Sequence, residues 1–465
     1  MANIICGVIQ KNKKFYFSFD TESKILTIQP TKMQINQSLI LEHDFEDYPY
    51  LKNPINICGE TNEHRYIEFM NVKFSSIGRG CFQAWVPAYI IGLTNGLYPI
   101  AKPNNIKEIV FQGECIDRLL TAKKNVSNDW DEKNNKLQIN VEYGKDKIKE
   151  FNFNKNTYSF VPSWKMPSTA KDVINVLIVN TYLKISSKNK LRVEKIIELY
   201  KNVERFFSFS CNRQHVEFEK ILLRETIPVD YFGNIKKTTI EFELFVSSDS
   251  VQRDIPAIGR TLTILDEFTM IPNIMKSLEE NKFIILSFPN SALDASIVDN
   301  DKYINIASSF EAEFDKLYPK YKTLKNKDFK LAKENILAYL NKEMENKQFS
   351  RKTRGYFKDF YDYIELNEGR LEEKLCYVYE KYESIIIDDI NYYKNKFSLN
   401  NISKNELAKA FSIKRNLLSH GAKLEKFNKL EIVAYSLLRK INYAMILERS
   451  GFNKDSIKRI VEQIM

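Results

Sequence analysis

Hydrophobic and polar positions alternate along the first third of the chain. Residues 13–20 (KKFYFSFD) and 24–30 (KILTIQP) place aromatic and β-branched side chains at alternate positions, which is typical of strands with one buried face. Residues 54–72 predict two further strands joined by the polar turn GETNEH. Residues 1–168 are therefore expected to form a β-rich N-terminal domain.

Residues 169–295 mix two periods. Residues 188–209 repeat apolar side chains every three or four positions, as a helix does, whereas residues 237–248 alternate as a strand does. No proline- or glycine-rich linker marks a boundary with the preceding residues. The pattern predicts a mixed α/β middle region that is either separate from the first domain or continuous with it.

From residue 296 onward the pattern is helical. Helices are predicted over residues 303–318, 372–386, 403–421 and 429–451, with a short last helix from residue 453. Ser403 and Glu406 have the spacing of a capping box, and Gly421 is placed as the left-handed residue that ends this helix. The sequence thus predicts an α+β chain in which residues 296–465 form an all-α helical bundle.

Composition limits the class of protein. Hydrophobic residues make up 43% of the chain, which is enough to bury real cores and excludes a disordered protein. The six cysteines include no CxxC pair, so we expect neither a metal site nor a disulfide framework. The N-terminus lacks the features of a signal peptide, and the apolar runs are shorter than the ~18 residues of a spanning helix. We therefore expect a soluble, cytoplasmic protein with no membrane partner.

The positive charge is concentrated near one short motif. The net charge is +10, and residues 391–430 hold nine Lys+Arg against two Asp+Glu. This segment contains KRNLLSHG (414–421), in which Arg415, Asn416 and His420 lie near the end of a predicted helix. A local positive field attracts polyanions such as RNA. A purely structural interpretation stays open, because the helix dipole favours cations in a last turn and glycine then caps the helix.

The stretch RNLLSHG resembles the active-site motif of HEPN-domain ribonucleases, in which an arginine is followed by a polar residue, often asparagine, and then by a histidine. A helical bundle after a sheet-rich region resembles the Apea-like HEPN group of bacterial anti-phage, abortive-infection proteins. The resemblance implies that Arg415, Asn416 and His420 are catalytic and that the chain cleaves structured cellular RNA such as tRNA. It also implies that a phage-derived product triggers the protein, and that the N-terminal region senses this trigger or regulates the cleavage.

The chemistry of these residue types agrees with that implication. RNA can be cleaved by its own 2′-hydroxyl, so the reaction needs no cofactor or metal and should persist in EDTA. Histidine can move a proton near neutral pH, and arginine can bind the phosphorane oxygens. Lys414, Lys423 and Lys426 are candidates for contacts with flanking phosphates. Each of these lysines fits equally well as part of a solvated face.

Two further expectations concern the geometry around the motif. Arg415 lies at the edge of the apolar stripe of its helix, and Glu311 lies on the apolar side of its own helix, so we predict that Glu311 orients Arg415. On an unbroken helix, Arg415 and His420 point about 140° apart and are separated by about 7.5 Å along the axis. We therefore expect a homodimer through the bundle with a composite active site. The alternative is a helix that breaks near Leu418.

Two other functions stay open at this point. One is a non-catalytic helical module that binds RNA, nucleotide or protein, in which Arg415 and His420 contact an anion. The other is a peripheral membrane protein, but the sequence contains no convincing basic amphipathic helix.

Overall fold

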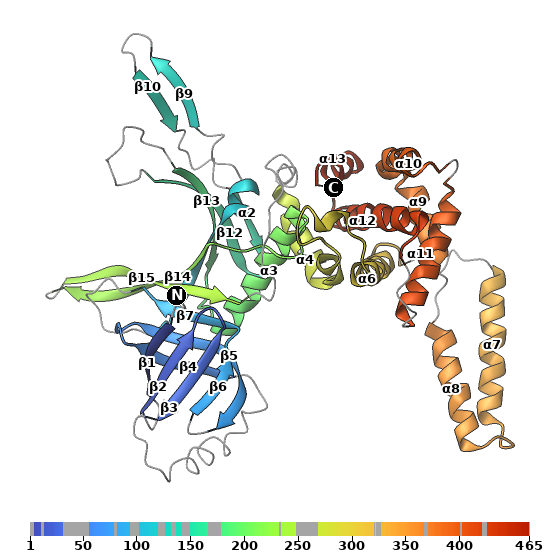
Figure 1. Ribbon diagram of the computed structural model, residues 1–465, viewed down its shortest axis with the longest axis horizontal. Coiled ribbons are helices and arrows are strands. Elements are labelled where there is room, and N and C mark those ends of the chain that lie inside the picture. Colours follow the sequence, from blue (N-terminus) through green and yellow to red (C-terminus); the bar gives the residue numbers. More distant parts are fainter. Residues whose placement is uncertain are drawn as a thin grey trace. The chain divides into compact units, whose positions relative to one another are not determined.

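The computed structural model shows two compact units (Figure 1). It describes residues 4–10, 14–30, 55–78, 81–93, 102–119, 126–131, 136–141, 149–165, 178–231, 234–247, 268–319, 321, 327–366, 371–399, 402–420 and 426–464. The sheet unit comprises Met1–Phe207 and His215–Ile258, and the helical unit comprises Ser208–Gln214 and Gly259–Met465. The predicted α+β class is confirmed. The predicted boundaries at residues 168 and 295 stay predictions.

Part of the sheet unit closes on itself. Its strands are β1 (Ile4–Gln10), β2 (Lys14–Asp20), β3 (Ile25–Pro30), β4 (Ile55–Thr61), β5 (Tyr66–Gly78) and β6 (Cys81–Trp85). They pair antiparallel in the order β5-β4-β1-β2-β3-β6, and β6 pairs again with β5. Alternate side chains such as Phe17, Phe19 and Phe69 meet inside this ring. The alternation seen in the sequence therefore marks the interior of a barrel.

The same sheet continues beyond the ring. The remaining strands are β7 (Ala88–Gly92), β8 (Ile106–Gln112), β11 (Lys149–Phe153), β12 (Asn156–Lys165), β13 (Ile178–Ser187), β14 (Lys220–Tyr231) and β15 (Asn234–Val246). They follow β5 in the order β7-β15-β14-β8-β13-β12-β11. Helix α2 (Glu114–Leu119) follows β8, and β9 (Val126–Asp131) pairs with β10 (Lys136–Val141) as a separate hairpin.

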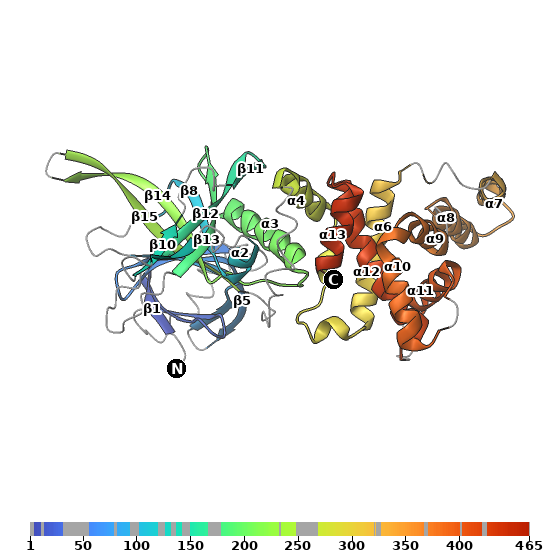
Figure 2. The same ribbon diagram turned by 90° about the horizontal axis from the view of Figure 1, so that it is seen from above.

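Helix α3 (Val193–Cys211) lies along this part of the sheet (Figure 2). Its Tyr200 ring lies 6.5 Å from Phe111 of β8, and its Phe207 ring lies 6.3 Å from Phe160 of β12. Phe207 belongs to the apolar face that the helical period predicted, and Tyr200 follows Ile196 of that face by one turn. The middle region thus supplies a helix that covers strands from the N-terminal third of the chain.

The helical unit contains the following helices. They are α4 (Ile271–Glu280), α5 (Phe283–Leu286), the short 3₁₀ turn Asp294–Ser296, α6 (Asn300–Leu317), α7 (Lys327–Glu345), α8 (Arg351–Leu366), α9 (Leu371–Lys381), α10 (Glu383–Phe397), α11 (Lys404–Ser419), α12 (Lys429–Arg449) and α13 (Lys454–Ile464). The helix expected over residues 372–386 is divided at Tyr382, which leaves helical geometry and donates its hydroxyl to Glu448 at 2.6 Å. Helices α7 and α8 were not foreseen.

Aromatic rings join α6, α11 and α12. The Tyr303 ring of α6 lies 4.4 Å from Phe411 of α11 and 5.7 Å from Tyr435 of α12, nearly parallel to both. Burial raises the pKa of Tyr303 far above its ordinary value, so this residue packs as a neutral ring. The three helices therefore share one core, and α11 is fixed against α6 through it.

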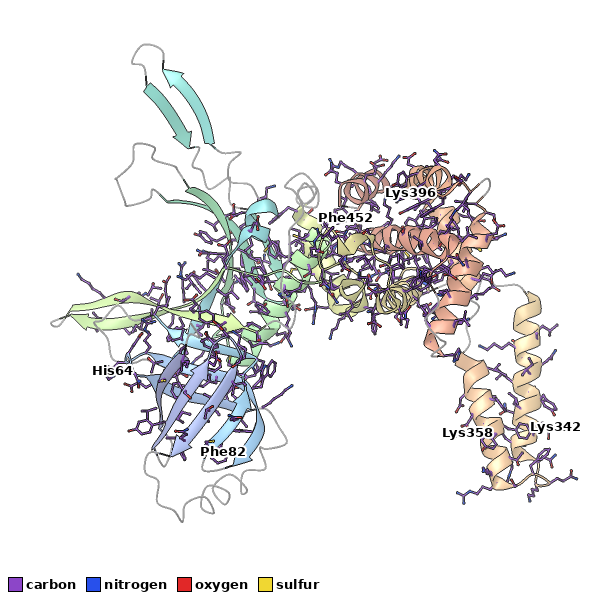
Figure 3. The ribbon with its side chains drawn as sticks, viewed as in Figure 1. His64, Phe82, Lys342, Lys358, Lys396 and Phe452 are labelled. Carbon is purple, nitrogen blue, oxygen red and sulfur yellow. The ribbon has the colours of Figure 1, made fainter. Side chains whose placement is uncertain are left out.

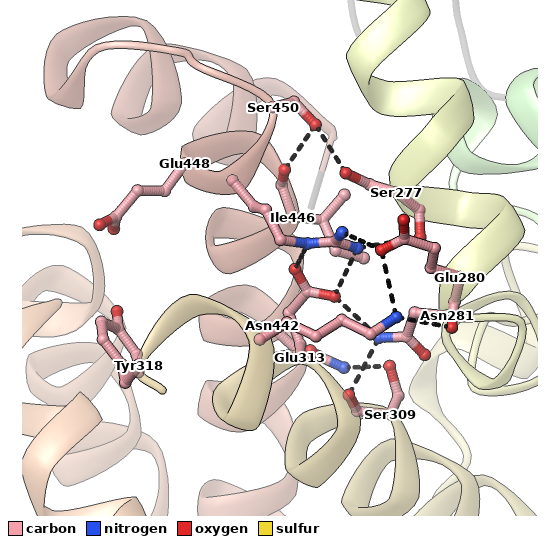
Figure 4. A network of polar contacts seen from close by, with 12 residues as sticks. Ser277, Glu280, Asn281, Ser309, Glu313, Tyr318, Asn442, Ile446, Glu448 and Ser450 are labelled. Atoms are coloured by element: carbon pink, nitrogen blue, oxygen red, sulfur yellow. Dashed lines mark hydrogen bonds and ion pairs between the residues drawn. The ribbon is translucent and has the colours of Figure 1, made fainter. Parts of the chain in front are cut away.

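A buried polar network binds α6 to α4 and α12 (Figure 4). The Arg449 guanidinium, at the end of α12, donates to both carboxylate oxygens of Glu313 and, at 2.6 Å, to Glu280. Asn281 donates its amide to Glu313 at 3.1 Å and to the Ser309 carbonyl at 3.0 Å. Because the Glu313 carboxylate is fully buried, these donors supply the hydrogen bonds that water would otherwise make.

Candidate functional site

Helix α11 begins as the sequence predicts. The Ser403 hydroxyl accepts from the backbone N–H of Glu406, and the Glu406 carboxylate accepts from the backbone N–H of Ser403, each at 3.1 Å. The capping box is therefore confirmed. Leu407 and Phe411, one turn apart, are buried and fix which face of α11 turns toward the core.

Arg415 lies at the edge of that buried face and forms an ion pair with α6. Its guanidinium donates to the Glu311 carboxylate at 3.1 Å and to the Asn416 side-chain oxygen at 3.3 Å. The side chains of Arg415 and Glu311 are 32% and 33% exposed, so the pair is held by the bundle but remains open to solvent on one side. The predicted contact is present, and the orienting role of Glu311 stays a prediction.

His420 lies just beyond the last turn of the same helix. It is the C-cap residue, its side chain is exposed, and its backbone N–H donates to the Asn416 carbonyl at 3.1 Å. Helix α11 continues through Leu418 and ends at Ser419, and the alternative in which Arg415 and His420 converge within one chain stays a prediction. Within one chain, the two side chains leave the helix about 140° apart.

The three candidate lysines differ in position. Lys414 is buried, with its ammonium 3.8 Å from the Glu431 carboxylate and 4.8 Å from the Phe427 ring centre. Lys426 is exposed, and Lys423 lies outside the described residues. Contact of Lys414 with phosphate stays a prediction, and it would require the ammonium to leave this buried position.

One feature of this helix was missed by the sequence reasoning. Ile413 and Leu417 are 50% and 48% exposed, although both are large and apolar. At about 100° per residue, Ile413 lies within about 20° of the direction of His420, and Leu417 within about 60°. The spacing of these residues was the available signal, since both lie about 80° or more around the helix from the buried Leu407 and Phe411.

The described residues place two limits on other kinds of site. Where side chains are described, no three or more His, Cys, Asp and Glu residues gather in a way that could hold a metal ion. Among the helices in the described part of the chain, none is both long enough and apolar enough to cross a membrane.

Comparison with known proteins addresses the first half of the chain. Residues 25–254 match the family described as ApeA N-terminal domain 1. Neither the comparison with curated proteins nor that with solved structures finds a match. The match ends before α4, so the likeness of the helical unit to HEPN domains remains a prediction. An ApeA N-terminal domain indicates anti-phage defence. The match over residues 25–254 thus indicates an ApeA-like family of anti-phage proteins.

Proposed function

We propose that the chain is a defence endoribonuclease whose helical unit cleaves structured cellular RNA such as a tRNA loop. The observation that carries the proposal is the end of α11, where Glu311 holds a partly exposed arginine and the exposed Asn416 and His420 follow it along the chain. An arginine fixed by a carboxylate on one side and open on the other is suited to bind a phosphate. The membership of residues 25–254 in an anti-phage family supports the biological setting.

The proposed reaction uses the substrate's own hydroxyl as nucleophile. The 2′-oxygen attacks the adjacent phosphorus while its proton is removed, and the bond from phosphorus to the 5′-oxygen breaks as that oxygen gains a proton. The products are a 2′,3′-cyclic phosphate and a 5′-hydroxyl. In this scheme His420 transfers a proton, Arg415 binds the non-bridging oxygens as negative charge builds up, and Asn416 orients its neighbours.

A second copy of the chain would complete the site. Arg415 and His420 diverge on an unbroken α11, so one helix cannot enclose a phosphate with both. The exposed Ile413 and Leu417 lie on the side of α11 from which His420 projects, and they are suited to contact an equivalent helix. A two-fold axis beside α11 would bring both residue types from each chain into one cleft.

The sheet unit is proposed to sense the phage-derived trigger or to restrain cleavage by the helical unit. Single-stranded loops expose the sugar–phosphate chain to in-line attack, which supports a loop as the substrate. A phage-derived trigger would then act through the ApeA-type region, residues 25–254. The alternative, a helical module that binds RNA without cutting it, uses the same residues for anion contact only.

The test compares Arg415→Ala and His420→Ala with Lys454→Ala, which removes an exposed cation elsewhere in the helical unit. Purified proteins are incubated with total RNA in EDTA, and the new 3′ ends are sequenced and examined for cyclic phosphate. We expect both α11 variants to lose cleavage and phage protection while folding normally, and Lys454→Ala to match wild type. Full activity of folded His420→Ala would refute its role. RNA binding without any cleavage by wild type would favour the binding module.

A further inference from the structure

Helices α7 and α8 form a hairpin that packs mainly on itself (Figure 1). Its turn and the adjoining helix ends, residues 342–358, are called the hairpin tip. The tip contains six basic residues, Lys342, Lys347, Arg351, Lys352, Arg354 and Lys358, against the acidic Glu343 and Glu345, a net of +4. All of these cations except Arg354 are exposed, and Figure 3 shows Lys342 and Lys358 on the hairpin. None of the six forms an ion pair with a described residue.

The position of these cations is not explained by helix stability. Arg351, Lys352 and Arg354 lie in the first turn of α8, which contains no acidic residue. The N-terminal end of a helix carries partial positive charge, so cations there weaken the helix, whereas an anion there is stabilised. The first turn of α8 therefore gathers positive charge at the expense of its own stability, and an external anion would relieve that repulsion.

Exposed aromatic rings lie among the cations. Tyr356 and Phe360 are 53% and 57% exposed, and with Lys352 they follow one another at four-residue spacing along one face of α8. The Phe349 ring, in the turn, contacts Phe357 edge-on at 5.3 Å, and the Ser350 hydroxyl accepts from the backbone N–H of Thr353 at 3.1 Å. The tip is thus held in shape while its Tyr356, and Phe360 one turn beyond, face solvent.

Gly355 lies on the same exposed side, one turn after Arg351. A Cβ atom at this position would meet nothing within 4 Å, so no packing within the described residues requires a glycine. Glycine inside a helix is unfavourable because it loses the most conformational freedom on folding. Without a side chain at Gly355, the helix backbone is uncovered between two cations and an aromatic ring. The phosphates of an RNA strand can therefore approach the helix closely.

We propose that the hairpin tip is an RNA-binding arm, which binds the substrate at a place separate from the residues of α11 that cleave it. This inference extends the proposed nuclease function, and the identity of the ligand as RNA rests on that function. Cations bind phosphates and exposed aromatic rings stack on unpaired bases, and the tip holds both. A second copy of the tip is disfavoured because two surfaces of net charge +4 repel each other. A membrane would need a continuous apolar face, which Lys352 and Asp359 interrupt.

The experiment measures binding separately from cleavage. Full-length His420→Ala protein is titrated into a fluorescein-labelled RNA stem–loop, with and without the tip substitutions Lys347→Ala, Arg351→Ala and Lys352→Ala. The matched control removes the same number of exposed cations from the sheet unit, through Lys188→Ala, Lys236→Ala and Lys237→Ala. We expect the tip variant to bind at least ~10-fold more weakly at low salt, with its slope of log affinity against log salt reduced by about 2, since each phosphate contact contributes about 0.7. The control should stay within about 2-fold of the parent.

A second variant, Tyr356→Ser, tests the aromatic contribution without a change of charge. It should weaken binding with an unchanged salt slope, because stacking releases no counterions. Equal binding by the tip variant and its parent would overturn the proposal, as would equal losses in the tip and control variants. Loss of self-association in the tip variant would overturn the proposal in favour of a second copy of the chain. Wild type that binds phosphatidylserine vesicles but not RNA would overturn it in favour of a membrane. Wild type that binds RNA through the tip but never cuts it would refute the proposed nuclease alone.

Discussion

At the scale of single residues, the Arg415–Glu311 pair gives a graded prediction. Because the pair is about one-third exposed, its loss should cost no more than about 1 kcal/mol. Glu311→Gln should therefore lower kcat/KM for RNA cleavage by at most about fivefold. Glu311→Asp should recover part of the loss, and the melting temperature should change little.

The control for this prediction is Asp301→Asn, which removes an exposed carboxylate from the first turn of the same helix. It should leave kcat/KM near the wild-type value. A Glu311→Gln protein as active as wild type would mean that Arg415 does not need its partner. A protein that unfolds would mean that the pair is structural.

A second residue-scale prediction concerns acid stability. Burial of the Glu280 carboxyl acts to raise its pKa, but hydrogen bonds from Arg449 and Lys316 outweigh it, and the pKa lies below the ordinary value of 4.5. A carboxyl with a lowered folded-state pKa contributes stability above its unfolded pKa and loses it as pH falls through the folded pKa. The urea midpoint of wild type should therefore fall more steeply below about pH 4.5 than that of Glu280→Gln. Identical pH profiles would contradict this assignment.

At the scale of elements, the Arg449 network predicts a large loss of stability. Arg449→Met leaves the Glu313 carboxylate fully buried without its main partner, which should lower the free energy of unfolding by about 3–5 kcal/mol. The double variant Glu313→Gln/Arg449→Met removes both charges and should recover a substantial part of that loss. Urea unfolding followed by circular dichroism measures both effects. A double variant no better than Arg449→Met would show that packing, and not charge, dominates here.

Local signals predicted the elements that carry the candidate site. The capping box at Ser403 and Glu406 and the long apolar periods located α11 and α12, because these features depend on residues within one or two turns. The contact between Glu311 and Arg415 followed from two polar residues on apolar faces that needed partners. A contact of this kind can be predicted when few polar groups lack partners and both residues lie on helices with clear apolar faces.

Other features depend on contacts that no local pattern contains. The partnership of Arg449 with Glu313 joins residues far apart in sequence, and nothing near either residue indicates the other. The sequence predicts that Lys414 contacts a phosphate or lies on a solvated face, yet it lies three residues after Phe411 and seven after Leu407, which places it on the buried stripe. The hairpin of α7 and α8 was missed although α8 repeats apolar residues at helical spacing, at positions 356, 357, 360, 361 and 364. That rings such as Tyr356 and Phe360 stay exposed is not indicated by this local pattern.

At the scale of the whole molecule, the unbroken α11 predicts complementation between inactive chains. When inactive Arg415→Ala and inactive His420→Ala proteins are mixed and allowed to exchange, mixed dimers contain one intact arginine and one intact histidine. Cleavage should recover to about a quarter of the wild-type rate. Half of the dimers are mixed, and each mixed dimer keeps one of its two arginines and one of its two histidines. The assay is RNA cleavage after co-incubation.

The matched control mixes Arg415→Ala with the double variant Arg415→Ala/His420→Ala, which cannot restore an arginine in any pairing. Sedimentation measurements on the same samples establish that the chains associate. Wild type that is monomeric and fully active at the assay concentration would refute the composite site, and so would exchanged mixtures that stay inactive.

Helix α6 carries Glu311 and Glu313 two residues apart, about 200° around its axis. One carboxylate faces α11 and the other faces α12, so a rotation of α6 in either direction strains both ion pairs together. The position of Arg415 is therefore coupled to the buried ion pair of Glu313 and Arg449, although the two pairs lie on opposite sides of α6. A substitution that rotates α6 but keeps both carboxylates should weaken both pairs together, so that stability and cleavage fall in parallel.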